Sequence, residues 1–401
     1  MKRKVEIANK LYPWFSGLSA DLIFYIAISS IWLTTIKGFN PAEITFLYTI
    51  SSFFCILFQI PSLSIIKKLG NTKSIRVGSV LLLLSSIMVT FCTNYISFAI
   101  ANIFLEMSLV FETMSAIIIK NNLNYLDKND EYIHTRNKAG IIYAISTAII
   151  TLFSGILFNI HAYLPMILGI LTCLFCFIIS FFIFDIDEEK KETNKEEIKL
   201  TLPKPLKLFI YVLLFYGIFY GILTIGQQNG QLLIQYELSN SLSLVKVTNY
   251  LAIILFTTRI IRIITNWLYP TIYKKLNNKV SIIFSLSLLI SCVLLLLGFY
   301  LDINFYIKVL LLTIGFSIYP SLREPVKIYT QNLILTTYSK KYHKDILVYM
   351  SLAKHIGTFL FSLFASFILL KLPIQQLFIA LIFLILPMIV ITTTILKTLK
   401  K

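Results

Sequence analysis

Residues 185–205, DIDEEKKETNKEEIKLTLPKP, lie almost at the midpoint of the 401-residue chain and differ in composition from the sequence on either side. The segment carries many charges of both signs and ends in Pro203 and Pro205. Such a stretch cannot be buried in hydrocarbon and is typical of a hydrated linker. It predicts a chain of two domains, residues 1–184 and 206–401, joined by a cytoplasmic linker at residues 185–205.

On each side of this linker, long apolar segments alternate with short polar ones. Hydrophobic residues make up 57% of the chain and charged residues only 14%, with a mean hydropathy of +0.81, which soluble globular domains do not reach. A helix crosses a bilayer core of about 30 Å with roughly 20 apolar residues. We therefore expect an all-α integral membrane protein with twelve transmembrane helices. They are expected at about residues 12–36, 43–66, 75–93, 95–119, 138–159 and 163–184, and at about 206–236, 245–270, 280–299, 303–335, 346–371 and 374–396.

The basic residues indicate how the chain is oriented, because loops that cross the membrane avoid positive charge. The chain has 36 Lys and Arg residues and a net charge of +17. The loops on one side of the expected membrane hold only Lys37, Lys246 and Lys371. We therefore expect a multi-pass protein of the cell membrane with both termini in the cytoplasm. The same asymmetry explains the net charge without a nucleic-acid partner.

The two domains share short sequence matches at a nearly constant offset. IPSLSIIKKLGNTKSIR (residues 60–76) follows the second expected span, and LYPTIYKKLNNKVSI (residues 268–282) follows the eighth. Aligning their KKL triplets also aligns Asn71 with Asn278, and KNNL at residues 120–123 similarly matches TQNL at residues 330–333. Both offsets are close to half of the chain, which predicts two six-helix repeats.

The loop after the second span resembles the signature of the major facilitator superfamily, G-x-L-a-D-R-x-G-R-K. The residues that fit in or near this pattern are Pro61, Lys68, Gly70 and Lys73. Leu63, Lys67 and Asn71 replace its glycine, its aspartate and its second arginine. The resemblance, which extends to a branch of bacterial permeases, implies the major facilitator fold and transport by alternating access. It also implies a central cavity lined by spans 1, 4, 7 and 10, and a gate to which we assign Lys68 and Gly70.

Polar side chains at membrane depth are the candidate substrate and coupling residues. A charge in hydrocarbon costs at least about 2.5 to 3.5 kcal/mol on insertion scales, so it needs a partner, a water-filled cavity or a function. The candidates are Asp21, Glu106, Glu112, Gln227, Gln228, Asn229, Arg259 and Arg262. Glu106 and Glu112 are expected either to take up the coupling proton or to form structural ion pairs, since burial without a cation favours the protonated carboxyl group. Asp21 is expected to form a salt bridge.

The seventh and eighth spans offer two further patterns. Gln227, Gln228 and Asn229 lie in a cluster of amides that is expected to need water or a ligand. In the same span, small residues recur at every fourth position or nearly so, which favours close helix packing or a bend; they are Gly217, Gly221, Gly226 and Gly230. Arg259 and Arg262 share a helix face. They are expected to meet Glu106 or Asp21 in a salt bridge, or an anionic group of the substrate.

Charged residues in the tenth and eleventh spans suggest a gate and a relay. Arg323 and Lys327 lie one turn apart between Pro320 and Pro325, and a bend there would redirect both cations, so we assign them with Glu324 to a cytoplasmic gate. The alternative is that Glu324 neutralises the two cations. His355 is a candidate proton relay because imidazole titrates near neutral pH. Alternatively, His355 has a structural role and donates a hydrogen bond to a backbone carbonyl.

Other classes of protein lack the motifs that they need. No G-x-x-x-x-G-K-[ST] loop indicates a nucleotide-driven pump, and neither H-E-x-x-H nor G-x-S-x-G indicates an enzyme. The five cysteines lie in apolar runs, so we expect no metal site, cofactor or disulfide. The sequence therefore favours a monomeric, proton-coupled secondary transporter of a small organic solute, with export preferred. The alternatives are an importer of an anionic metabolite and a non-transporting scaffold or sensor with the same fold.

Overall fold

The computed structural model describes residues 2–112, 114–128, 131–186, 206–338 and 343–399. These residues form helices and no strand. They make two compact units. Unit 1 contains the described residues up to Trp32 and from Phe54 to Ile186, and unit 2 contains Leu33–Phe53 and the described residues from Leu206 onwards. Nearly all of the expected linker lies outside the described residues.

Unit 1 accounts for most of the first six expected spans. Its helices are α1 (Lys2–Leu18), α2 (Ile23–Ile31), the second part of α3 (Pro41–Leu69), α4 (Asn71–Phe91), α5 (Tyr95–Glu112), α6 (Ser115–Tyr125), α7 (Glu131–Ile160) and α8 (Leu164–Ser180). The first and fourth spans are therefore each interrupted, which the apolar pattern did not predict.

Unit 2 accounts for the last six spans and also includes residues that precede the linker. These earlier residues belong to a π-helical turn, η1 (Trp32–Ile36), and to the first part of α3. The remaining helices are α9 (Leu206–Ser239), α10 (Leu244–Leu276), the short 3₁₀-helix η3 (Asn277–Lys279), α11 (Val280–Tyr300), α12 (Phe305–Thr337), α13 (His343–Lys371) and α14 (Ile374–Leu399).

The lengths and apolar character of the helices agree with twelve spans. Ten segments of the described chain are long and apolar enough to cross a membrane, and one of them, Leu244–Tyr300, contains both α10 and α11. The shorter apolar helix α8 adds another. The predicted fold class is confirmed.

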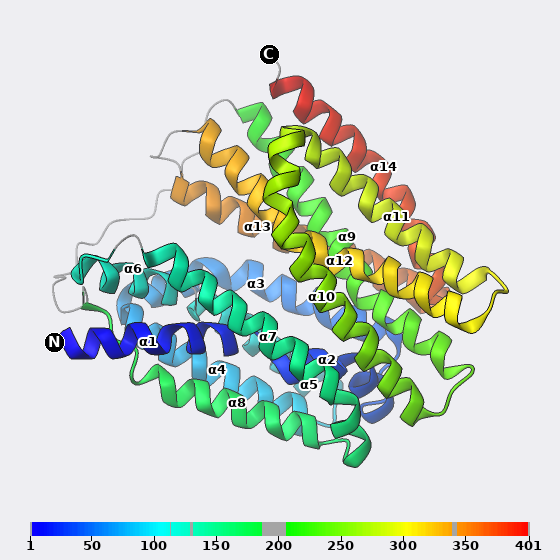
Figure 1. Ribbon diagram of the computed structural model, residues 1–401, viewed down its shortest axis with the longest axis horizontal. Coiled ribbons are helices and arrows are strands. Elements are labelled where there is room, and N and C mark those ends of the chain that lie inside the picture. The colour runs from blue at the N-terminus through cyan, green and yellow to red at the C-terminus, as the bar shows by residue number, and fades with distance from the viewer. Residues whose placement is uncertain (1, 113, 129–130, 187–205, 339–342, 400–401) are drawn as a thin grey trace. The chain divides into compact units, whose positions relative to one another are not determined.

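Equivalent helices pack in the same pairs in both units (Figure 1). In unit 1 the third span, α4, packs against α5 of the fourth span and against α8, the sixth. In unit 2 the ninth span, α11, packs in the same way against α12 and α14. The pairing of the first span with the fifth, α1 and α2 against α7, recurs as α9 against α13. This shared pattern confirms the two six-helix repeats.

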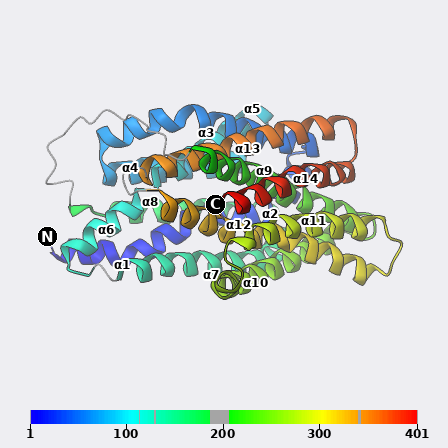
Figure 2. The ribbon, with the colours of Figure 1, turned by 90° about the horizontal axis from the view of Figure 1, so that it is seen from above.

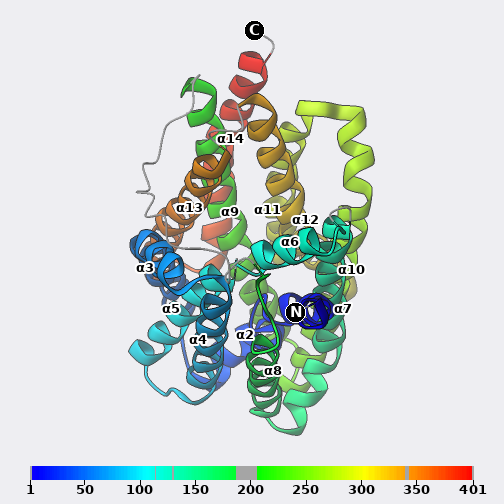
Figure 3. The ribbon, with the colours of Figure 1, turned by 90° about the vertical axis from the view of Figure 1, so that its left-hand side faces the viewer.

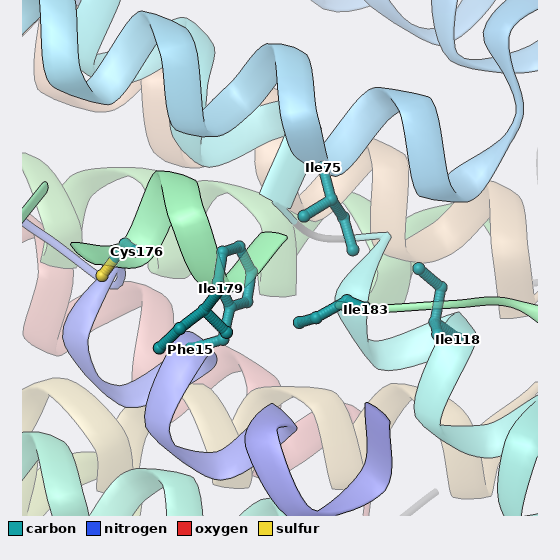
Figure 4. Close-up of a cluster of buried hydrophobic side chains, with 6 residues drawn as sticks. All are labelled: Phe15, Ile75, Ile118, Cys176, Ile179 and Ile183. Carbon is teal, nitrogen blue, oxygen red and sulfur yellow. The ribbon is translucent and has the colours of Figure 1, made fainter. Parts of the chain in front are cut away.

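An apolar cluster lies where several elements of unit 1 meet. Figure 4 shows its side chains converging from α1, α4, α6, α8 and the segment that follows α8; they are Phe15, Ile75, Ile118, Cys176, Ile179 and Ile183. All are buried. The thiol of Cys176 packs here as a small apolar group, and the five cysteines are free.

In unit 2 the glycines of α9 allow close contact with α13, which runs beside it (Figure 2). A Cβ atom on Gly357 of α13 would collide with the carbonyl oxygen of Gly217, and one on Gly221 would lie 2.7 Å from the ring of Phe361. The expectation that these glycines serve helix packing is confirmed.

Candidate functional site

The structure distributes the candidate residues unevenly between the units. Unit 1 contains the candidate acids of the first and fourth spans, with Lys68 and Gly70 of the loop; the acids are Asp21, Glu106 and Glu112. Unit 2 contains the candidate amides, together with Glu324, His355 and the candidate cations of α10 and α12. Acidic candidates are thus concentrated in one unit and basic candidates in the other.

Asp21 lies in the interruption between α1 and α2. Its Oδ1 accepts a hydrogen bond of 2.9 Å from the backbone N–H of Leu22, and the hydroxyl of Ser19 donates to the carbonyl of Phe15 at 2.8 Å. The Asp21 side chain thus takes the backbone N–H of Leu22, which a continuous helix would use, and this contact stabilises the break. The break places a carboxylate inside the first span.

The two glutamates of α5 have different surroundings. The thiol of Cys55 lies 3.7 Å from Glu106 Oε2, and the Glu106 side chain is half-buried. Glu112, the last residue of α5, is only 8% exposed, and its Oε1 has no hydrogen-bond partner in the described part of the chain. A Cβ on Gly78 of α4 would lie 3.2 Å from Glu112 Cγ, so this glycine makes room for the glutamate. Within the described residues, neither glutamate forms an ion pair.

The loop between α3 and α4 turns at Gly70, whose φ of 79° favours glycine. Lys68 beside it is exposed. The next residue, Asn71, stands where the family pattern has arginine. Its Nδ2 donates to Oδ2 of Asp185 at 2.7 Å, and Asn121 donates to Asp185 Oδ1 at 3.1 Å.

Asp185 is fully buried, and its neighbour along the chain is also held by an amide. Asn122 Nδ2 donates to the carbonyl of Phe184 at 2.6 Å. This amide network ties α4 and α6 to the end of the first repeat. The sequence analysis did not single it out, although the repeated Asn71 and the KNNL match contain three of its members.

The amides of α9 are bonded mainly by the part of α3 and η1 that belongs to unit 2. Gln228 Nε2 donates to the carbonyl of Ile44 at 3.1 Å, and Gln235 Nε2 donates to Thr34 Oγ1 at 2.7 Å. Asn229 Oδ1 accepts from Thr45 at 3.3 Å. For these three contacts, residues 184 to 201 positions earlier in the chain supply the partners. In the described part of the chain, Oε1 of Gln228 and of Gln235 still has no partner.

The two arginines of α10 also differ from each other. Arg262 Nη2 lies 3.6 Å from Glu324 Oε1 of α12, and α10 and α12 lie side by side (Figures 1 and 3). Glu324 thus pairs with a neighbouring helix, not with Arg323 or Lys327 of its own helix as one alternative had it. Arg259 is 8% exposed, its Nε has no hydrogen-bond partner, and it forms no ion pair among the described residues. The salt bridge to Glu106 or Asp21 remains a prediction.

The other candidates of unit 2 do not form one cluster. α12 continues as a helix through Pro320 and Pro325, and the carbonyl of Arg323 accepts a hydrogen bond of 2.9 Å from Tyr220 Oη. Lys327 is exposed. His355 is half-buried in α13 and, within the described residues, makes no hydrogen bond to a backbone carbonyl. The gate and the relay remain predictions.

A cavity of about 440 Å³ lies in unit 1. It is lined mainly by apolar side chains of α1, α2, α7 and α8, with Ser146 and Thr172 as its hydroxyl groups. None of the candidate residues lines it. Among the residues that the structure describes, no group of three or more His, Cys, Asp or Glu side chains is placed to hold a metal ion.

Comparison with known proteins finds a family model and solved structures that this chain resembles. Residues 14–330 match the family model of the Major Facilitator Superfamily. The crystal structure of the nucleoside transporter NupG is similar with a TM-score of 0.75 at 12% identity, covering 97% of this chain and 99% of that one. A bacterial homologue of the human lysosomal transporter Spinster, in an inward-facing and unoccupied conformation, has a TM-score of 0.70 at 11% identity, covering 99% and 98%. No curated protein matches the chain significantly.

Proposed function

Since this chain belongs to the major facilitator superfamily and is a membrane transporter rather than an enzyme, we propose that it exchanges a small organic solute for protons by alternating access. In this proposal the solute moves out of the cell as protons move in. The protein works as a monomer in the cell membrane, with both termini in the cytoplasm and without a cofactor.

The environment of Glu112 is the observation that carries the proposed coupling. Its carboxylate is 8% exposed at the end of α5, and one of its oxygens has no hydrogen-bond partner in the described part of the chain. A carboxyl group that is buried without a cation favours its neutral form, and it releases its proton when water or a cation reaches it. Glu112 therefore has the properties of a group that binds and releases a proton during transport.

Glu106 is the second coupling candidate. It lies six residues earlier in α5, and in the described residues it also forms no ion pair; its nearest polar contact there is the thiol of Cys55 at 3.7 Å. Glu106 is thus a second, half-buried acid of the same helix as Glu112.

The coupling is tested with the full chain in liposomes that enclose a pH-sensitive dye. Because the solute is unknown, metabolites and drugs are first screened for compounds that raise the melting temperature of the detergent-solubilised protein. Each hit is then added under an imposed pH gradient. We expect solute-driven proton movement with wild type. In Glu112→Gln this movement should fall to the level of empty liposomes, while stability stays within about 1 kcal/mol of wild type, because the substitution is nearly isosteric.

Glu131→Gln is the matched control. It removes a carboxylate of the same unit that is half exposed and pairs with Lys128 at 2.9 Å, so it should leave transport unchanged. Glu106→Gln shows whether the second acid is also needed. If both Glu112→Gln and Glu106→Gln retained full pH dependence, the coupling assignment would be wrong. If wild-type liposomes transported none of the compounds found in the screen, a non-transporting scaffold or sensor would become the favoured function.

A further inference from the structure

Arg259 is a buried cation for which the described part of unit 2 provides no counter-charge. It lies in the middle of α10, is 8% exposed, and has no hydrogen-bond partner at Nε. An arginine at membrane depth is retained where it meets an acid, an anion or water. Among the described residues of unit 2, no acid is in ion-pair contact with Arg259.

The acids of unit 2 that lie closest to membrane depth already have partners. Glu237 of α9 accepts from Lys308 Nζ at 2.8 Å, and Glu324 of α12 lies 3.6 Å from Arg262. Each of these carboxylates thus already meets another cation of unit 2. An anion that balances Arg259 therefore has to come from outside this unit.

A second polar group without a partner lies on the same face of α10. Asn266 follows Arg259 by seven residues, two helical turns or about 10 Å along the axis. Its Oδ1 is buried and has no hydrogen-bond partner in the described residues. The face therefore offers a cationic donor at one end and an amide acceptor at the other, with the Arg262–Glu324 pair between them.

We propose that Arg259 binds an anionic group, a carboxylate or a phosphate, of the transported solute, and that Asn266 accepts a hydrogen bond from a hydroxyl or amino group elsewhere in the same solute. The planar guanidinium can donate two parallel hydrogen bonds to either anion. The proposal rests on the proposed function only in taking the anion to be part of a transported solute. An outward-moving anion and an inward-moving proton are both driven by a membrane potential that is negative inside.

The site is tested by thermal unfolding of the detergent-solubilised full chain with inorganic phosphate or succinate, using chloride at equal ionic strength as the reference. At a concentration about tenfold above its Kd, a bound anion should raise the wild-type melting temperature by about 3 °C. Arg259→Gln should abolish this rise. Arg259→Lys should retain part of it, since lysine keeps the charge but not the planar donor pair.

Lys246→Gln is the matched control, because it removes one positive charge from an exposed position of the same helix. Its melting temperature should rise with phosphate or succinate as much as that of wild type. A further set of samples contains phosphatidylglycerol in place of the soluble anions. If only that lipid raised the melting temperature in a way that depends on Arg259, the site would bind a lipid headgroup and the solute assignment would be overturned. An equal rise in wild type and Arg259→Gln, or no rise with either soluble anion, would also overturn it.

The outcome is separable from that of the proposed function. Solute-driven proton movement by wild type without anion binding at Arg259 would reject this site and keep the transporter. Anion binding that depends on Arg259, with no transport in liposomes, would keep the site and reject the transporter.

Discussion

At the scale of single residues, the buried side chain of Asp185 is contacted by the amide groups of two asparagines. Asn71 occupies the position of an arginine in that signature and still bonds Asp185, at 2.7 Å, while Asn121 bonds the other carboxylate oxygen. A carboxylate that accepts several amide hydrogen bonds can remain buried. In this chain the asparagine at the signature's arginine position supplies a neutral amide donor to Asp185.

Removing the Asp185 carboxylate should destabilise unit 1. Asp185→Ala leaves the amides of Asn71 and Asn121 without their acceptor, at a cost of about 1 to 3 kcal/mol for unsatisfied buried groups. We expect a melting temperature several degrees below that of wild type. Asp302→Ala is the control, since Asp302 is exposed and its loss should change stability by no more than about 0.5 kcal/mol. Equal effects of the two substitutions would contradict this account of the network.

At this scale the sequence identified which residues are polar at membrane depth but not their partners. Gln228 was marked as part of an unusual amide cluster, and its amide donates to the carbonyl of Ile44, which lies far away in the sequence. Glu324 was assigned with Arg323 and Lys327 to a gate, and the structure adds a contact with Arg262 of the neighbouring helix. Pairing across helices depends on rotation and register, which a single sequence does not specify.

At the scale of helices, the contact between α9 and α13 depends on the absence of side chains. Gly357→Ala would place a Cβ against the carbonyl oxygen of Gly217, which is backbone and cannot move aside. We expect a loss of about 1 to 3 kcal/mol from overpacking, measured as a lower melting temperature.

Gly140→Ala is the matched control for this substitution. Gly140 lies inside α7, and nothing lies within 4 Å of the place that a Cβ atom would take there. Alanine at this position should therefore stabilise the helix by about 0.5 to 1 kcal/mol. The two substitutions should have opposite signs. A stabilising effect of Gly357→Ala would show that the two helices can separate at little cost.

Helix limits were largely predictable because hydropathy reports them directly. The expected span at residues 280–299 corresponds to α11, Val280–Tyr300, and the span at 374–396 corresponds to α14, Ile374–Leu399. The interruption at Ser19–Asp21 was not predicted, since local side-chain bonds to the backbone cause it. The prolines of α12, by contrast, lie within an unbroken helix.

At the scale of the whole molecule, the distribution of basic residues makes a prediction about topology. An epitope tag at either terminus should be protected from protease in intact cells with permeabilised outer layers and cleaved in inverted membrane vesicles, because positive loops stay in the cytoplasm. A tag inserted between Lys37 and Asn40, in a loop of the opposite side, should give the reverse result. Cleavage of a terminal tag from outside would overturn the assigned orientation.

The repeats were predictable from the matched KKL and NNL/QNL segments, and the shared helix pairs bear this out. The grouping of Leu33–Phe53 with the second unit was not predictable. This segment is apolar like the rest of its span, and its partners lie hundreds of residues away, such as Ser362, whose hydroxyl is 2.9 Å from that of Thr49.

The chain passes from one unit to the other at Trp32–Leu33 and at Phe53–Phe54, in addition to the linker. The first crossing lies in the π-helical turn η1, and the second lies inside α3 just after Ser51, whose hydroxyl bonds back to the carbonyl of Leu47 at 2.9 Å. Wide turns and such serine bonds both make a helix easier to bend. The chain is therefore easiest to bend at the two places, outside the linker, where it leaves one unit for the other.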